Sequence, residues 1–378
     1  AVALVALAAV LITRNDPAPH APLVQSTLLP PDGWDFAPAS PFAVSPDGSQ
    51  VVFEVVARPD NETGTPGANS LWVRHLSRPE ARQLTETGGN AYPFWSPDGQ
   101  WVGFFANGKL SKVEARGGPI IPLCDATDGR GGTWNHNGVI IFQRAWSEGL
   151  MTVPAGGGAS RPLTTLNEDH FEIAHRWPSF LPDGRHFLFY IVSTTNPATS
   201  QHSGIYIGSL DQGEPRLLMR SESRGLHSWG HLLFRSGSTL LARPFDASKQ
   251  EFTGDAVPVS TDITGGGISW GGAQFGASES GVIAHMRGAE ATSTQLSWRD
   301  RKGVPLITLG DQDAYWEMDL SPDGKRLAVS IGVTNTGDIW IIDLERDMRA
   351  RFTFDPVDDR FPLWSPDGSR LAYVSTEG

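Results

Sequence analysis

The chain alternates short apolar runs with clusters of turn-forming residues along most of its length. Residues 101–105 (WVGFF) and 338–343 (DIWIID) are typical of these runs, because aromatic and β-branched side chains favour strands. No segment keeps apolar residues at i, i+3, i+4 and i+7 over the three or four turns that a helix needs. The pattern therefore predicts an all-β protein built from many short strands.

One four-residue phrase, Ser-Pro-Asp-Gly or Leu-Pro-Asp-Gly, recurs between the predicted strands. Proline presets φ for the second position of a turn, aspartate suits the third, and glycine takes the left-handed position that completes a hairpin. Each copy is therefore predicted to form a hairpin tip, in which the aspartate serves backbone geometry rather than chemistry. The five Asp-Gly pairs are Asp47-Gly48, Asp98-Gly99, Asp183-Gly184, Asp323-Gly324 and Asp367-Gly368.

The spacing of these copies reveals a repeat. Successive aspartates are 51, 85, 140 and 44 residues apart, and the two long steps are close to two and three times 45. Degenerate copies at 136–138, 229–231 and 279–281 fill the gaps. Four short strands per unit of this length are typical of a β-propeller blade. We therefore predict a β-propeller of four-stranded blades with seven complete repeats and a partial eighth that begins at Arg360.

The first residues have a different character. Residues 1–12 (AVALVALAAVLI) are all apolar, and a helix of this length covers about 18 Å of a bilayer core that is about 30 Å thick. We predict that residues 1–12 are the end of a truncated transmembrane helix and residues 13–22 a juxtamembrane linker. The alternatives are the apolar region of a signal peptide and a buried segment. Residues 23–378 are assigned to the propeller, incomplete at its C-terminus.

Composition narrows the function classes. The chain has 30 Lys and Arg against 42 Asp and Glu, a net charge of −12, which opposes the phosphate-neutralising contacts that nucleic-acid binding requires. The single cysteine, Cys124, excludes an internal disulfide and a cysteine-based metal cluster. The 42 Gly and 28 Pro fit a turn-rich fold rather than a helix bundle.

The repeated hairpin phrase resembles that of TolB-like, WD-repeat-like propellers. Residues 232–246 and 295–372 further resemble the extracytoplasmic propeller of bacterial membrane-anchored serine/threonine kinases, in which a cytoplasmic kinase domain, one membrane helix and a propeller follow in order. The resemblance implies a non-enzymatic sensor or protein-interaction domain on the extracytoplasmic (periplasmic) side of the bacterial cytoplasmic membrane. It implies no cofactor, attachment to the membrane through the N-terminal helix, and a protein, peptide or small ligand as the partner.

Two other classes stay open. The same propeller resembles the gating domain of prolyl-oligopeptidase-type serine peptidases, and it resembles TolB-like periplasmic interaction modules and the sensor half of membrane-anchored winged-helix regulators. The chain carries no glycine-rich phosphate loop, no His-Arg-Asp catalytic loop and no Asp-Phe-Gly. We therefore predict no catalytic residue in this chain, and a kinase domain of the same polypeptide would precede it.

Three sequence patterns resemble catalytic or metal-binding motifs. For each of them we favour a structural role. Residues 267–271 (GISWG) match a nucleophile elbow formally, but glycines stand where the buried strand should precede it. The histidine pairs 170/175 and 227/231 lack the helix that would bring both rings to one metal. The acidic clusters at 311–313 and 355–359 lack the ligand pattern of a calcium loop. No metal site is predicted.

Most aromatic side chains beside the turns, such as Trp95 and Trp298, are expected to pack between blades. A ligand site, if present, should lie at a mouth of the central channel, where residues just before each first strand converge. The candidate binding residues are Tyr92, Trp134, His175, Arg176, His227, Trp270, Trp316 and Arg360.

Overall fold

A computed structural model describes residues 27–375 apart from 38–41, 59–67, 89–90, 194–200, 212, 262, 264–270, 287–293, 302–303, 333–336, 347 and 356. The predicted membrane segment, the linker and Trp270 therefore lie outside the described residues. Within that part of the chain, no helix has the length and apolar character that crossing a bilayer requires.

Five antiparallel sheets follow one another from the N-terminal side, and in each of them a turn phrase or its degenerate copy joins two paired strands. The first contains β1 (Trp34–Phe36), β2 (Ala43–Val44), β3 (Gln50–Ala57), β4 (Asn69–His75) and β5 (Ala81–Glu86). The second contains β6 (Phe94–Trp95), β7 (Trp101–Ala106), β8 (Lys109–Glu114) and β9 (Ile121–Asp125). The third contains β10 (Gly132–Trp134), β11 (Val139–Gln143), β12 (Leu150–Pro154) and β13 (Arg161–Pro162).

The fourth and fifth sheets keep this plan. The fourth contains β14 (Glu172–Phe180), β15 (His186–Ser193), β16 (Gly204–Ser209) and β17 (Arg216–Met219), preceded by the 3-10 turn η1 (Glu168–His170). The fifth contains β18 (Leu226–Ser228), β19 (His231–Ser236), β20 (Thr239–Asp246), β21 (Glu251–Phe252) and β22 (Val257–Ser260).

The remaining strands form four smaller or separate sheets. Two pairs come first, β23 (Phe275–Ala277) with β24 (Ile283–His285), and β25 (Thr294–Arg299) with β26 (Pro305–Asp313). A four-stranded sheet follows, made of β27 (Tyr315–Leu320), β28 (Arg326–Ile331), β29 (Asp338–Asp343) and β30 (Met348–Arg351). The last pair is β31 (Asp359–Trp364) with β32 (Leu371–Ser375).

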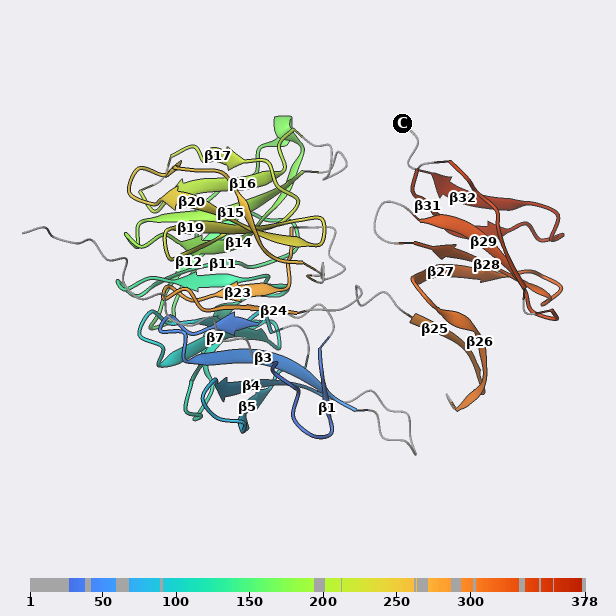
Figure 1. Ribbon diagram of the computed structural model, residues 1–378, viewed down its shortest axis with the longest axis horizontal. Coiled ribbons are helices and arrows are strands. Elements are labelled where there is room, and N and C mark those ends of the chain that lie inside the picture. The colour runs from blue at the N-terminus through green and yellow to red at the C-terminus, as the bar shows by residue number, and fades with distance from the viewer. Residues whose placement is uncertain are drawn as a thin grey trace, which may run out of the picture.

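Figure 1 shows these strands in two groups, with β1 to β24 in one and β25 to β32 in the other. In the first group the inner strands contact one another in the order β2, β6, β10, β14, β18, β23, and β23 contacts β2 again. Hydrogen bonds join the sixth sheet to both neighbours, for example from Ser280 Oγ to the Asp47 carbonyl at 3.0 Å and from Ser228 Oγ to the Ser278 carbonyl at 2.7 Å. The six sheets therefore surround one axis.

The predicted blades are present as strands. All five turn phrases and the three degenerate copies connect the first two strands of a repeat, so the all-β propeller class and the repeat count are confirmed. The structure differs from the expectation in one respect, because the sixth repeat is divided. Its first two strands, β23 and β24, complete the six-membered ring, whereas β25 and β26 pair with each other in the second group.

The core lies between adjacent sheets of the ring, as blade packing requires. One cluster joins buried side chains of the second to fifth sheets, including Phe94, Phe142 and Tyr190. The Phe94 ring fits only because its neighbours are glycines: a Cβ at Gly103 would lie 2.4 Å from Phe94 Cζ, and one at Gly132 would lie 2.4 Å from Phe94 Cε1. Glycine in these strands therefore marks close ring packing.

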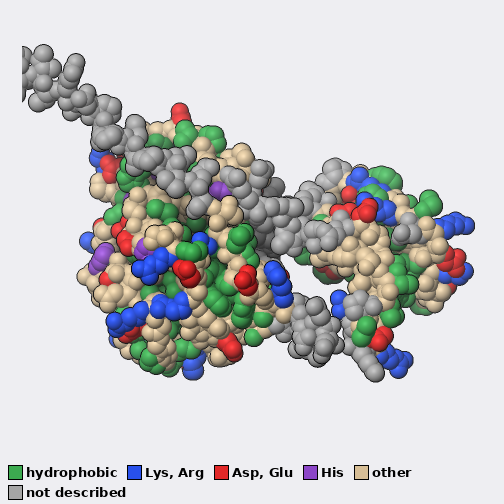
Figure 2. All heavy atoms as spheres, turned by 60° about the horizontal axis from the view of Figure 1, so that its bottom comes forward, with side chains coloured by type: hydrophobic (Ala, Val, Ile, Leu, Met, Phe, Trp, Pro, Cys, Tyr) green, Lys and Arg blue, Asp and Glu red, His purple; other side chains and the backbone are tan. Residues whose placement is uncertain are grey.

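The second group has its own small core around Leu296, Val329 and Ile342, but leaves more apolar surface open. Leu363 is 61% exposed and Leu306 is 63% exposed. Trp298, which was expected to pack between blades, is 41% exposed. Figure 2 shows hydrophobic side chains on the surface of both groups, with basic and acidic side chains interspersed among them.

Candidate functional site

The hairpin tips are held by a hydrogen-bond network that recurs from copy to copy. In the second blade, Ser96 Oγ donates to Asp98 Oδ1 at 2.5 Å and accepts from the Trp101 N–H at 2.9 Å. Asp98 Oδ1 also accepts from the Gln100 N–H at 3.0 Å, and Gly99 takes a φ of 68°. The same serine–aspartate bond is present in the first, seventh and eighth repeats, so these aspartates act on the backbone.

The network also changes the acidity of the turn aspartates. The Ser45 hydroxyl, followed by the N–H and hydroxyl of Ser49, lowers the pKa of Asp47 to about 2. The corresponding bonds from Ser365 and Ser369 lower the pKa of Asp367 to about 2. Hydrogen bonds to a carboxylate stabilise its charged form, so these side chains stay ionised at any physiological pH.

Two tips lack the serine and use other groups. Leu181 replaces it in the fourth blade, where His186 Nδ1 lies 2.5 Å from Asp183 Oδ2. Asn135 replaces it in the third blade, and its Oδ1 accepts from the N–H groups of Asn137 and Val139. Its Nδ2 also donates to the Gly184 carbonyl at 2.7 Å, which ties two neighbouring tips together.

A cavity of about 190 Å³ lies on the axis of the six-sheet ring and is lined by residues from the first strand, or its flanks, of every sheet. At one end it is bordered by the prolines of three turn phrases, Pro46, Pro97 and Pro182. At the other end it is lined by Tyr92, Trp177 and Arg224. The repeat therefore gathers chemically different side chains around one axial space.

The aromatic pair at this second end sits on unusual backbone. Tyr92 has a φ of 43° and Trp177 a φ of 55°, in the left-handed region that bulky residues rarely enter. Each stands four residues before the Ser or Leu of a turn phrase and directly before a proline. Their rings meet edge to face with centroids 5.4 Å apart. Because the third repeat has Gly131 at the same position with a φ of 77°, this geometry belongs to the inner strand of the blade.

Three arginines surround the aromatic pair. Arg130 Nη1 donates to the Tyr92 hydroxyl at 3.3 Å, and the guanidinium groups of Arg130 and Arg176 lie 4.5 and 4.3 Å from the centre of the Trp146 ring. Arg224 lies 5.7 Å from the Trp177 ring. Burial, then the charge of Arg130, lowers the pKa of Arg176 to about 10. Of the three arginines, Arg224 lines the cavity together with Tyr92 and Trp177.

His227 lines the same cavity from β18. Burial, followed by the neighbouring His231, lowers the pKa of His227, so the ring is neutral at pH 7. It packs edge to face on Phe245 at 6.1 Å between centroids. Of the sequence candidates that the structure describes, Tyr92, Trp134 and His227 line this cavity.

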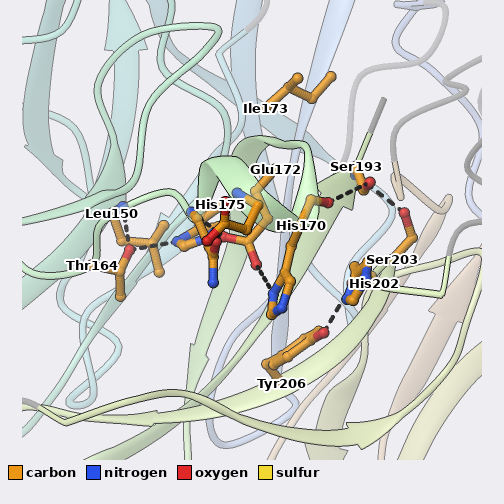
Figure 3. Close-up of polar contacts among 12 residues, drawn as sticks. Leu150, Thr164, His170, Glu172, Ile173, His175, Ser193, His202, Ser203 and Tyr206 are labelled. Atoms are coloured by element: carbon orange, nitrogen blue, oxygen red, sulfur yellow. Dashed lines mark hydrogen bonds and ion pairs between the residues drawn. The ribbon is translucent and has the colours of Figure 1, made fainter. Parts of the chain in front are cut away.

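His175 and Arg176 are fully buried behind it. Figure 3 shows the surroundings of His175, where Thr164 Oγ1 lies 2.7 Å from Nδ1 and Glu172 Oε2 lies 3.0 Å from Nε2. The order Thr-His-Glu resembles a nucleophile, base and orienting acid. However, His175 is 0% exposed, and Thr164 Oγ1 also accepts from the Leu150 N–H at 2.8 Å. The cluster therefore joins β12 to β14 structurally.

The same cluster continues to a second pair of histidines. His170 Nδ1 lies 3.7 Å from Glu172 Oε1, and the rings of His170 and His202 stack with centroids 4.0 Å apart. The structure thus brings the predicted pair of His170 and His175 to one carboxylate rather than to each other. Among the described residues, no group of three or more His, Cys, Asp or Glu side chains is arranged to hold a metal ion.

The last candidates lie in the second group. Arg360 stacks on Trp316 at 5.0 Å and pairs with Asp358 at 2.7 Å. Asp313 of the other acidic cluster pairs with Arg349 at 2.7 Å. Arg360 and Trp316 therefore belong to a different site from the axial cavity. Of the GISWG stretch only Gly271 is described, and a Cβ there would lie 2.2 Å from the Tyr190 ring.

Trp177 and Arg224 are two of the cavity residues that the sequence did not single out. Trp177 carried a signal, because it precedes its turn phrase by the same four residues as Tyr92 and is followed by the same proline. Arg224 carried none, since it stands in the fifth repeat, where the turn phrase is degenerate. Only the packing of β18 beside β23 brings it to the axis.

Comparison with known proteins gives limited matches. No family model matches the chain. The uncharacterized peptidase YuxL of Bacillus subtilis (strain 168) is 26% identical over 165 residues, which are 43% of this chain and 23% of that protein. The match therefore spans under a quarter of the peptidase's length.

Solved structures are similar only distantly. TolB from Acinetobacter baumannii is 16% identical with a TM-score of 0.44, over 58% of this chain and 54% of that one. Puromycin hydrolase is also 16% identical, with a TM-score of 0.40, over 89% of this chain and 58% of that one. The propeller assignment rests on the sheets themselves, namely antiparallel four-stranded units whose first strands surround an axis.

Proposed function

We propose that this chain is a non-enzymatic β-propeller that binds a partner at its axial cavity. In this proposal it is the extracytoplasmic sensor or protein-interaction part of a bacterial membrane-anchored serine/threonine kinase whose kinase domain lies upstream. The observation that carries the binding role is the cavity, which six blades line with aromatic, cationic and imidazole groups. A concave site with a few converging polar groups is the usual form of a binding site.

The side chains around the cavity support binding rather than catalysis. The lining hydroxyl of Ser278 is bonded to Ser280 and to the Val282 N–H, not to a histidine. The lining His227 packs on Phe245. A nucleophile needs a base within hydrogen-bond reach, and these contacts provide none. The kinase connection and the membrane location rest on the resemblance of residues 232–246 and 295–372 to that family's propeller.

Site-specific photocrosslinking in cells tests the binding role. A photoreactive amino acid at position 136 lies at the cavity, since His136 lines it, whereas position 161 on the exposed outer strand β13 is the matched control. We expect a discrete adduct from position 136 that disappears when Ala277, another lining residue, is replaced by Phe. Equal adducts from both positions, or none from position 136, would contradict the proposal.

The wider assignment has its own test. Sequencing the reading frame on both sides should reveal a kinase domain and a membrane helix upstream, and Ala277→Phe should then change autophosphorylation in response to the partner. A second candidate is the gating propeller of a serine peptidase, which the 26% identity to the YuxL peptidase favours. A hydrolase domain with a nucleophile elbow downstream would support that candidate and refute the kinase assignment.

A further inference from the structure

The guanidinium of Arg224 is the cation that faces the axial cavity from the fifth blade. Its Nη2 donates to two backbone carbonyls of the sixth blade, those of Ala273 and Phe275. Its Nε is buried without a hydrogen-bond acceptor. In the described part of the chain, no carboxylate forms an ion pair with it. The charge is thus neutralised only by peptide dipoles.

Aromatic rings beside Arg224 further reduce the hydration of its charge. Phe275 and Trp177 lie 5.3 and 5.7 Å from the guanidinium carbon, and they replace water on its flanks. Burial lowers the pKa of Arg224 to about 10, which leaves the group charged at pH 7. A cation that has lost water without gaining a counter-ion favours an anion strongly, and a carboxylate matches the guanidinium geometry best.

Other charged side chains lie near this part of the cavity. Arg130 and Arg176 lie around Tyr92 at this end of the cavity. The two carboxylates nearest Tyr92 are already engaged: Asp128 lies 3.4 Å from Arg130, and Glu54 accepts from Thr87 and from the Ala91 N–H. Among the described lining residues the charged side chains are Arg224 and Glu279, and Glu279 stands in the hairpin tip between β23 and β24, so Arg224 is the cation available to an anion in the cavity.

The volume limits what can enter. The cavity of about 190 Å³ is smaller than the ~300–1,000 Å³ that encloses a drug-sized ligand. It therefore accepts the end of a ligand rather than an internal loop of a folded protein. Tyr92, Phe94 and Trp134 supply apolar walls on the way to Arg224.

We propose that Arg224 makes the axial cavity a receptor for a carboxylate attached to an aromatic or apolar group. The shared chemistry fits the free C-terminus of a peptide and a small organic acid. This inference rests on the proposed binding function and names the ligand class of the same cavity.

Calorimetric titration with three probes tests the inference: the tripeptide Ala-Ala-Phe with a free carboxylate, the same tripeptide as its C-terminal amide, and phenylacetate. We expect the free acid to bind at least tenfold more tightly than the amide. Phenylacetate binding equal to that of the tripeptide acid identifies a small acid as the source, and weaker binding identifies a peptide terminus. Equal affinity of acid and amide, or no binding of either acid, overturns the inference.

Variants assign the effect to the cavity. Arg224→Gln should remove the tenfold preference, and Arg224→Lys should reduce it because lysine lacks the guanidinium fork. Arg161→Gln, on the exposed strand β13, should leave it unchanged. If Arg224→Gln does not fold, as judged by circular dichroism, Ala277→Phe keeps Arg224 but fills the space, and it should abolish binding of the free acid. Unchanged binding in every folded variant refutes the site.

The two proposals fail separately. Acid and amide that bind equally, and that both lose binding in Ala277→Phe, refute the carboxylate site but leave the cavity as a binding site. A photocrosslinked adduct at position 136, combined with equal binding of acid and amide, likewise refutes the carboxylate site but not the binding function. Absence of the adduct refutes the binding function itself.

Discussion

The hydroxyl of Ser96 offers a direct measure of what one hairpin tip contributes to stability. It is 2% exposed, donates to the charged Asp98 carboxylate at 2.5 Å and accepts from the Trp101 N–H at 2.9 Å. A hydrogen bond to a charged group contributes about 1.5–3 kcal/mol, and a buried N–H left without its acceptor costs about 1–3 kcal/mol. Because the two contributions overlap, we expect Ser96→Ala to lower the free energy of unfolding by about 2–3 kcal/mol.

Urea denaturation followed by circular dichroism and tryptophan fluorescence gives this difference from the shift in midpoint. For a unit of 150–250 residues it corresponds to a fall in melting temperature of about 5–10 °C. Ser96→Thr keeps the hydroxyl, so its free energy of unfolding should fall much less than that of Ser96→Ala.

The matched control is the more exposed copy in the eighth repeat. Ser365 makes the same bonds, to Asp367 at 2.6 Å and from the Arg370 N–H at 2.9 Å. Water can replace its hydroxyl, so Ser365→Ala should cost less than about 1 kcal/mol. If Ser96→Ala changes stability by no more than the control does, burial does not set the strength of the tip network and the reasoning is refuted.

Two further predictions concern packing and pH. Gly103→Ala should destabilise the chain by about 1–3 kcal/mol, because its Cβ would lie 2.4 Å from Phe94 Cζ; Gly156→Ala, where no atom lies within 4 Å, should be nearly neutral in the same urea titration. Burial lowers the pKa of His227 below its ordinary value of 6.5, so the unfolded chain takes up the proton first and stability falls as pH drops below about 6.5. Urea denaturation at pH 7.5 and at pH 5.5 gives the loss of unfolding free energy between the two pH values. This loss should be smaller in His227→Gln than in the unsubstituted chain, and an equal loss would contradict the direction of the pKa shift.

The local conformations were accessible from the residue order. Pro46 and Gly48 determine a hairpin tip through their own dihedral preferences, and the strands on either side follow from short apolar runs. Repetition of the phrase then revealed the blade, its length and the number of repeats. Even the degenerate tip at Asn135 could be placed from the spacing, because a repeat constrains copies whose residues have changed.

The site was accessible only in part. Tyr92 and Trp134 could be proposed for the axis because each precedes a tip that the repeat spacing located. His175 also precedes a tip, but it is fully buried and does not line the cavity, and Thr164 and Glu172 hold its ring. A one-residue change of register on a strand moves a side chain to the opposite face, and the bulge between Arg176 and Ser179 is not visible in the sequence.

The sequence by itself determined the class of fold, the repeat and the chemistry of the tips, because these depend on interactions between residues close along the chain. Only the tertiary structure decided that six sheets share an axis, that the sixth repeat divides between two groups of strands, and that Arg224 meets Trp177 at the cavity. These features depend on how sheets pack against each other over long sequence separations. The free energy of such packing depends on how side chains from two different blades fit together. No single stretch of the sequence contains both partners of such a contact.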